Sequence, residues 1–253
     1  MVRGAGPCPH DSAGWSLIKG KVMIVIQEPR YSSLSTCSYI PERQWRFEYF
    51  FAVNLTELEL NRLLERGWRK FGAYFFRPAC EGCRECIPIR VRVSDFKPSR
   101  SQKRVLRKCS EVRVEFNPLR YRDEIYEIYR DHSLNRFGRV TDNEDFLSSF
   151  YTKSCPSVQS EYYINGKLAA IGFLDIASEG LSTVYFAYKT EVECYSPGTY
   201  SILKEIEYAA MQSREYYYLG YYIRRNSSMA YKNSFLPNEK YDWNLEKWEQ
   251  DLD

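Results

Sequence analysis

The first half of the chain combines one helical pattern with two strand-like patterns. Residues 54–68 place apolar side chains at the spacing of an amphipathic helix, with Asn54 as a candidate N-cap. Residues 73–80 and 87–93 are short runs of aromatic and β-branched residues, which predict two strands on either side of a cysteine-containing loop. Residues 1–22 show no periodicity and are rich in Gly, so we expect a flexible tail there.

The second half of the chain alternates strands with helices. A hairpin is predicted over residues 161–176, because Asn165-Gly166 supplies the positive φ values of a two-residue type I′ turn. The same patterns predict helices over 123–138, 199–212 and 227–235, strands over 181–189 and 215–223, and a helix opened by a capping box of Thr141 and Glu144.

This order of antiparallel strands, helix, strand and helix is typical of the acyltransferase (GNAT-like) fold of acetyl-CoA-dependent N-acetyltransferases. Those enzymes hold the CoA pyrophosphate with a glycine-rich loop at a helix N-terminus. The equivalent loop here, "YSPGTYS" at residues 195–201, contains one Gly and no basic residue. We therefore predict an α/β (α+β) fold with a mixed, mainly antiparallel sheet and an acyl donor other than acyl-CoA.

Basic residues gather in one segment of a chain whose net charge is only +3. Residues 90–108 hold eight basic side chains against Asp95 alone. Such a segment suits a polyanion, of which RNA is the usual cytoplasmic example, and Lys103, Arg104 and Arg107 are the candidate contacts. The alternative is an ordinary solvated basic face.

The chain of 253 residues is long enough for one large or two small domains. No apolar run is long enough to cross a bilayer, and no signal-peptide pattern is present. We expect a cytoplasmic protein that has no membrane partner and is a monomer.

Three cysteines stand at three-residue spacing in "RPACEGCRECIPIR", at Cys80, Cys83 and Cys86. In a reducing compartment, clustered cysteines bind metal or perform redox chemistry more often than they form disulfides. With Cys37 as a fourth ligand, these thiolates would suit a structural or regulatory zinc ion or an iron–sulfur cluster. Buried thiols without a metal are the alternative, and the remaining cysteines are predicted to be inert.

Several longer segments resemble one enzyme family. "CSYIPER", "LLERGWRKFGAYFFRPACEGCRECIPIRV" and "FKPSRSQKRV" are similar to the N-terminal region of aminoacyl-tRNA–protein transferases. "LDIASEGLSTVYFAY", "SPGTYSILKEIEYA", "YYLGYYI" and "MAYKNSFLPNE" are similar to that family's C-terminal region. The short chain and the three-cysteine box resemble the bacterial aspartate/glutamate leucyltransferases more than the longer eukaryotic arginyltransferases.

The resemblance implies transfer of an aminoacyl group from charged tRNA to proteins beginning with Asp or Glu, with Leu favoured as the transferred residue and Arg as the alternative. The added residue would mark those proteins for degradation in an N-degron pathway. It also implies a cysteine-bearing domain over residues 23–110 and a GNAT-like transferase domain over residues 111–253. Because an aminoacyl ester is already activated, catalysis needs positioning and oxyanion stabilisation, with no catalytic cofactor.

Polar side chains near the expected splayed strands are the candidate site residues. The candidate catalytic groups are Tyr200, Tyr221, Tyr222, Tyr231, Lys232 and Asp175. The candidate substrate-binding residues are Arg77, Arg100, Arg104 and His132. Plain sheet packing is the alternative for the tyrosines. Two other classes of protein also stay open, an acyl-CoA N-acetyltransferase and a non-catalytic RNA-binding zinc protein.

Overall fold

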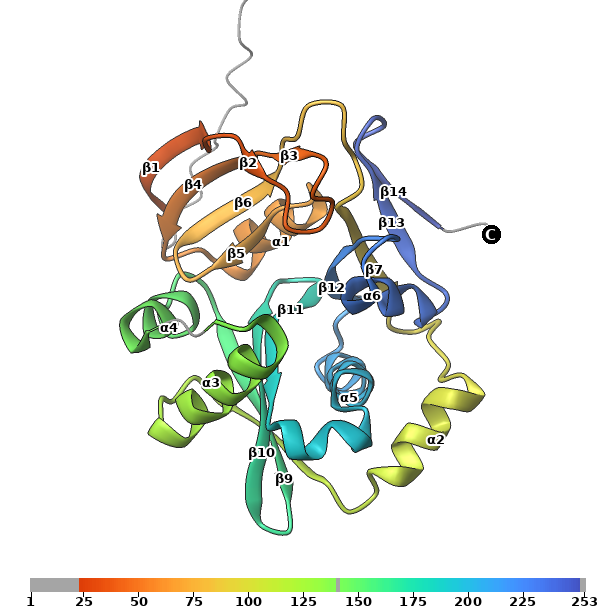
Figure 1. The fold of residues 1–253 in the computed structure, drawn as a ribbon. Coiled ribbons are helices and arrows are strands. Elements are labelled where there is room, and N and C mark those ends of the chain that lie inside the picture. Colours follow the sequence, from red (N-terminus) through yellow and green to blue (C-terminus); the bar gives the residue numbers. More distant parts are fainter. Residues whose placement is uncertain (1–22, 140–141, 251–253) are drawn as a thin grey trace, which may run out of the picture.

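The computed structural model describes residues 23–139 and 142–250, and the predicted flexible tail lies outside them. The described strands form a four-stranded sheet, an eight-stranded sheet and a two-stranded ribbon, with helices packed on the sheets (Figure 1). No described helix combines the length and the apolar character that crossing a membrane requires.

The four-stranded sheet is antiparallel and carries the N-terminal part of the chain. Its strands, in spatial order, are β1 (Ile24–Tyr31), β4 (Phe47–Val53), β6 (Tyr74–Pro78) and β5 (Arg69–Phe71). The ribbon of β2 (Ser35–Thr36) and β3 (Gln44–Trp45) lies in the connection between β1 and β4. Helix α1 (Glu57–Glu65) buries its apolar face, including Leu60 and Leu64, against Phe50 and Phe75 of this sheet.

The eight-stranded sheet is mixed and mainly antiparallel, as the sequence predicts. In spatial order it comprises β14 (Lys247–Gln250), β13 (Glu239–Asp242), β7 (Ile87–Arg92), β12 (Tyr216–Tyr222), β11 (Gly180–Tyr188), β10 (Lys167–Ile176), β9 (Ser157–Ile164) and β8 (Arg113–Pro118). The pair of β11 and β12 is parallel, and the other pairs in this sheet are antiparallel. The predicted hairpin turn forms at Asn165 and Gly166, both with positive φ.

Helices cover both faces of this sheet (Figure 1). On one face α3 (Asp123–Phe137) and α4 (Asn143–Phe150) bury their aromatic and aliphatic residues against β10 and β11. On the other face lies α5 (Pro197–Met211), which contacts α2 (Arg100–Lys108). The short elements η1 (Thr190–Tyr195), α6 (Ser227–Ala230) and η2 (Tyr231–Ser234) complete the chain.

Two predicted helix starts differ from the structure. Helix α1 is capped by Thr56, whose side chain forms a capping box with Glu59, and Asn54 instead has a φ of 63°. Helix α4 is capped by Asp142, whose side chain accepts a hydrogen bond from the backbone of Asp145. Thr141, the predicted cap, lies outside the described residues.

The eight-stranded sheet crosses the predicted domain boundary at residue 110. Strand β7 comes from the N-terminal part of the chain, yet it pairs with β12 and β13 from the C-terminal part. The division into residues 23–110 and 111–253 stays a prediction, and the shared sheet joins the two parts through main-chain hydrogen bonds.

Strands β11 and β12 diverge after a short stretch of pairing. Their parallel register covers only Gly180–Ser182 of β11 opposite Tyr216–Tyr218 of β12. Beyond this point β11 continues beside β10 as far as Tyr188, and β12 continues beside β7 as far as Tyr222. We call the point of divergence the fork, and the candidate site is built around it.

Candidate active site

Divergence of two strands leaves backbone groups without their ladder partners, and such groups need other hydrogen bonds. Thr183 is the first residue of β11 past the last paired residue, Ser182. The Nη2 atom of Arg69, on β5, donates a hydrogen bond to the Thr183 carbonyl. Arg69 therefore joins the N-terminal sheet to the fork and lies half-buried beside it.

Lys232 reaches the fork from the other side. It follows β12 in η2, and its Nζ atom donates to the carbonyl of Tyr221 at 3.1 Å. Gly220 lies between the two cations with a φ of 90°. A Cβ atom at Gly220 would lie 3.3 Å from Nζ of Lys232 and 3.7 Å from Nη2 of Arg69. Because Gly220 has no side chain, both cationic groups can approach the backbone at this residue.

Burial and charge shift the pKa values of both cations. Burial, and then the charge of Arg69, lower the pKa of Lys232 to about 7. Burial also lowers the pKa of Arg69, against the opposing influence of Tyr221 and Asp175. Within residues 23–139 and 142–250, neither cation forms a salt bridge with an acidic side chain. Lys232 can therefore exchange a proton near neutral pH, whereas a guanidinium keeps its charge.

Glu205 of α5 points at the same region from the helix. Its carboxylate accepts hydrogen bonds from the hydroxyls of Ser160 at 3.3 Å, Tyr162 at 3.5 Å, and Tyr217. Burial raises the pKa of Glu205 to about 7 despite these donors. The arrangement holds a buried acid and three hydroxyls where β12 leaves β11.

Tyr231 lies at the wider end of the fork and is 38% exposed. Its hydroxyl oxygen would lie 3.5 Å from a Cβ atom at Gly198, in the first turn of α5. Burial raises the pKa of Tyr231 to about 12, with Glu205 as a further cause. The phenol therefore stays protonated and is available as a hydrogen-bond donor.

His132 lies behind this end of the fork, on α3. Its ring contacts that of Tyr188, with 4.6 Å between the centroids, and the hydroxyl of Tyr188 accepts from Nη1 of Arg136 at 2.8 Å. Burial, and then Arg136, lower the pKa of His132 to about 4. The imidazole is neutral at physiological pH, and its predicted substrate-binding role stays a prediction.

The other predicted tyrosines are more enclosed. Tyr221 donates from its hydroxyl to the carbonyl of Gly67 at 3.2 Å and so faces the N-terminal part of the chain. Tyr222 packs in the apolar core between α5 and the sheet. The hydroxyl of Tyr200 lies 3.3 Å from the Cys109 carbonyl, in a second, apolar cluster. The structure thus places Tyr221, Tyr231 and Lys232 at the fork, and Tyr200 and Tyr222 in packed surroundings.

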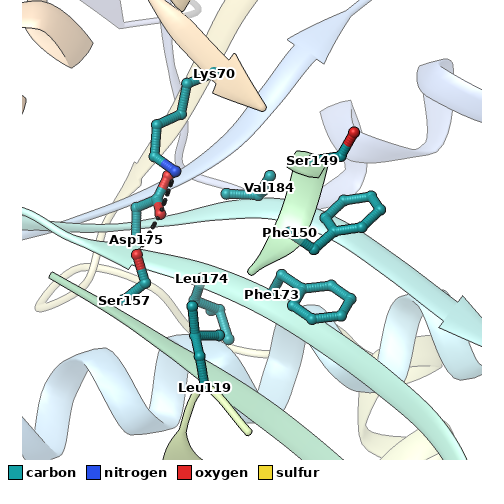
Figure 2. Close-up of a pocket in the computed structure, with 9 residues that line it drawn as sticks. All are labelled: Lys70, Leu119, Ser149, Phe150, Ser157, Phe173, Leu174, Asp175 and Val184. Carbon is teal, nitrogen blue, oxygen red and sulfur yellow. Dashed lines mark hydrogen bonds and ion pairs between the residues drawn. The ribbon is translucent and has the colours of Figure 1, made fainter. Parts of the chain in front are cut away.

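Asp175 of β10 forms a buried ion pair with Lys70 of β5, as Figure 2 shows. The Oδ1 atom of Asp175 also accepts from the hydroxyl of Ser157 at 2.8 Å and from the thiol of Cys155 at 3.4 Å. A small cavity beside this pair is lined by the pair itself and by apolar side chains that include Phe150 and Phe173. The ion pair and both hydrogen bonds reach Oδ1 and hold the Asp175 carboxylate within the protein.

The candidate arginines lie in two different settings. Arg77 pairs with Glu48 at 2.7 Å and lies over the ring of Trp68. Arg100 and Arg104 instead project from α2 into solvent. The exposed basic side chains of this helix are Arg100, Lys103, Arg104, Arg107 and Lys108. We call this set the α2 basic face, and it lies away from the fork in Figure 1.

The four candidate metal ligands are close enough to influence one another. Burial, and then the thiols of Cys80, Cys37 and Cys83, raise the pKa of Cys86 to about 12. The Sγ atom of Cys80 donates to the carbonyl of Arg46. The described part of the chain contains no group of three or more Cys, His, Asp or Glu side chains arranged to hold a metal ion. Burial favours the protonated form of the Cys86 thiol, whereas a bound metal needs thiolates, so metal binding by these four cysteines stays a prediction.

Three residues of this region escaped the sequence analysis: Arg69, Lys70 and Glu205. Glu205 had a visible signal, since it shares the buried face of α5 with Ile202 and Ile206. For Arg69 and Lys70 the sequence contained a weaker signal, the two adjacent cations in the short strand "RKF". An ionisable residue on a buried face needs partners, and in this protein they come from distant strands.

Two family models match the chain. The model described as "Arginine-tRNA-protein transferase, N terminus" matches residues 35–104, and its C-terminal counterpart matches residues 123–242. The chain belongs to the arginine-tRNA-protein transferase family. This family shares its order of N- and C-terminal regions with the chain, and the resemblance predicted from short motifs is confirmed. As a member of the family, the protein is an aminoacyl-tRNA–protein transferase.

Curated relatives lie within the same family. An aspartate/glutamate leucyltransferase of Helicobacter hepaticus is 35% identical over 83% of this chain and 90% of its own length. One from Campylobacter jejuni is 30% identical over 85% of this chain and 93% of its own. Among solved structures, the crystal structure of FemX aligns with a TM-score of 0.42 at 10% identity, over 77% of this chain and 79% of that one.

Proposed function

We propose that this protein transfers a leucyl group from leucyl-tRNA to the α-amine of proteins whose first residue is Asp or Glu. The observation that carries the proposal is the match to aspartate/glutamate leucyltransferases over more than four-fifths of the chain. A product that carries an N-terminal Leu would enter an N-degron pathway.

The charge at the fork supports Leu over Arg as the transferred residue. Arg69 is a permanent cation there, Lys232 adds a second charge when it is protonated, and the carboxylate of Glu205 already accepts from three hydroxyls. An arginyl side chain would meet like charge without a free carboxylate to offset it. A leucyl side chain brings no charge into this region.

The reaction is the aminolysis of an ester. The nitrogen of the acceptor α-amine attacks the ester carbonyl carbon, an amide bond forms, and the bond to the terminal ribose oxygen of the tRNA breaks. The neutral amine of Lys232, whose pKa is about 7, takes a proton from the α-ammonium group and returns it to the leaving ribose oxygen. The protonated hydroxyl of Tyr231 donates to the developing oxyanion.

The tRNA would be held mainly outside the fork. The α2 basic face offers exposed Lys and Arg side chains in a row, which suits phosphates of a nucleic-acid backbone. Zinc or an iron–sulfur cluster bound by Cys37, Cys80, Cys83 and Cys86 would be structural or regulatory and would take no part in these steps.

The deciding experiment is a transfer assay with separately charged leucyl-tRNA and arginyl-tRNA. Acceptor peptides begin with Asp, Glu, Arg or Ala, and a further Asp peptide is acetylated at its amine. We expect label from leucyl-tRNA to appear on the Asp and Glu peptides only. Label from arginyl-tRNA on those peptides would establish the arginyl activity instead, and equal labelling of the Ala peptide would overturn acidic-acceptor selectivity.

A further inference from the structure

Arg69 differs from most of the other partly or fully buried arginines in the described part of the chain. Four of these arginines pair with a carboxylate: Arg77 with Glu48, Arg90 with Glu239, Arg122 with Glu161 and Arg214 with Glu57. Within the described part of the chain, the Arg69 guanidinium instead donates to a backbone carbonyl, that of Thr183. The carboxylate that influences Arg69, Asp175, is itself engaged by Lys70. A cation in this setting gains most from an added anion.

We propose that Arg69 recognises the acceptor by binding the side-chain carboxylate of its N-terminal Asp or Glu. The inference rests on the proposed function and names the residue that sets its selectivity. The bond to Thr183 fixes the orientation of the guanidinium with one Nη2 donor, so further donors remain for the planar, two-point contact that carboxylates prefer.

The position of Arg69 relative to Lys232 supports this assignment. Both side chains approach the Gly220 backbone, at 3.7 Å and 3.3 Å from its Cβ position. In an N-terminal Asp, the side-chain carboxylate and the α-amine are separated by only two carbon atoms. A carboxylate held by Arg69 therefore brings the α-ammonium group to Lys232, the proposed proton acceptor. Recognition and proton removal would then depend on adjacent groups of one site.

The alternative anion is a tRNA phosphate. Phosphate backbones are usually held by exposed cations in extended rows, as on the α2 basic face. Arg69 instead lies half-buried, between the Thr183 carbonyl and Gly220, where a small terminal group fits better than a continuous backbone. The observations therefore favour the acceptor carboxylate.

The test compares Arg69→Gln with wild type, using leucyl-tRNA and peptides that begin with Asp or with Asn. We expect the KM for the Asp peptide to rise by about 30-fold or more, the range for removing one partner of a desolvated charge pair. The preference for Asp over Asn should disappear, while the KM for leucyl-tRNA stays within about twofold of wild type. Arg214→Gln is the matched control, because Arg214 already has Glu57 as its partner and its replacement should leave both constants unchanged.

Arg69→Lys is a second variant that keeps the charge and removes the planar two-point contact. It should fold and give an intermediate KM for the Asp peptide, so it decides the question if Arg69→Gln does not fold. Variants that keep the wild-type preference for Asp over Asn would overturn the proposal, and so would a raised KM for leucyl-tRNA alone, which would identify a phosphate contact. Failure of wild type to label any acidic peptide would instead overturn the proposed function.

Discussion

Lys70 and Asp175 form a buried ion pair that joins the two large sheets, with 3.0 Å between Nζ and Oδ1. The side chains are 7% and 4% exposed. Lys70 comes from β5 of the four-stranded sheet and Asp175 from β10 of the eight-stranded sheet. The neighbouring Arg69 also links the two sheets, through its hydrogen bond to the Thr183 carbonyl. One short strand thus positions the N-terminal part of the chain against the fork.

Breaking this pair should destabilise the fold. Asp175→Asn leaves the Lys70 charge buried without its counter-ion, so we expect the free energy of unfolding to fall by about 3–5 kcal/mol. Urea denaturation followed by circular dichroism measures this change. The double variant Lys70→Met/Asp175→Leu removes both charges and should recover most of the loss. A folded Asp175→Asn protein with unchanged stability and a lower kcat would show a catalytic role for Asp175 instead.

The pH dependence of transfer should report the state of Lys232. Burial and Arg69 lower its pKa to about 7, so its neutral, proton-accepting form grows as pH rises through 7. We therefore expect kcat to rise between about pH 6 and pH 8 and then level off. Lys232→Met should lower kcat by about 10²- to 10⁴-fold and remove this limb.

Arg69 provides an internal check on that assignment. Because its charge helps to lower the pKa of Lys232, Arg69→Gln should move the limb of the kcat profile to higher pH. A limb at the wild-type position in the Arg69 variant, or one that persists in Lys232→Met, would assign the titration to another group.

The α2 basic face should determine the salt dependence of tRNA binding. Replacing Lys103, Arg104 and Arg107 with Ala removes three exposed charges from one helix. The slope of log affinity against log salt should become shallower by about 0.7–0.9 for each phosphate that is no longer neutralised. Lys167→Ala, at the exposed β9–β10 turn, is the control and should not alter the slope. An equal slope for the triple variant and wild type would make this helix an ordinary solvated surface.

The cysteine cluster can be tested by metal analysis of protein purified without oxygen. A bound metal would require thiolates and would couple to folding, so we expect either about one zinc or iron with labile sulfide, and a lower melting temperature after chelation. Cys86→Ser should lose the metal, and the exposed Cys194→Ser should retain it. Cys155 is unsuitable as a control because its thiol contacts Asp175. Metal-free protein with full activity and unchanged stability would exclude a metal bound by these cysteines.

Much of the architecture was readable from local patterns. The Asn165-Gly166 turn identifies the β9–β10 hairpin, because that turn needs two positive φ values and Asn and Gly tolerate them. The apolar stripe that includes Ile202 and Ile206 identifies α5, although Ala210, which the sequence places on the same stripe, is exposed and Ala209 is buried instead. Cap positions do not follow from the pattern alone, since several polar residues compete for one helix start, and in α1 the N-cap is Thr56 rather than Asn54.

The sequence by itself determined the family, the strand and helix order of the C-terminal part and the basic character of α2. These depend on residues close together in the chain. Only the tertiary structure decided that β7 joins β12, that Arg69 and Lys232 approach the same backbone point at Gly220, and that Glu205 bonds to Tyr217 close to where β11 and β12 part. The reason is that strand divergence frees backbone groups, and the side chains that satisfy them come from segments far apart in sequence, such as β5 and η2. The spacing of residues along the chain does not predict such long-range contacts.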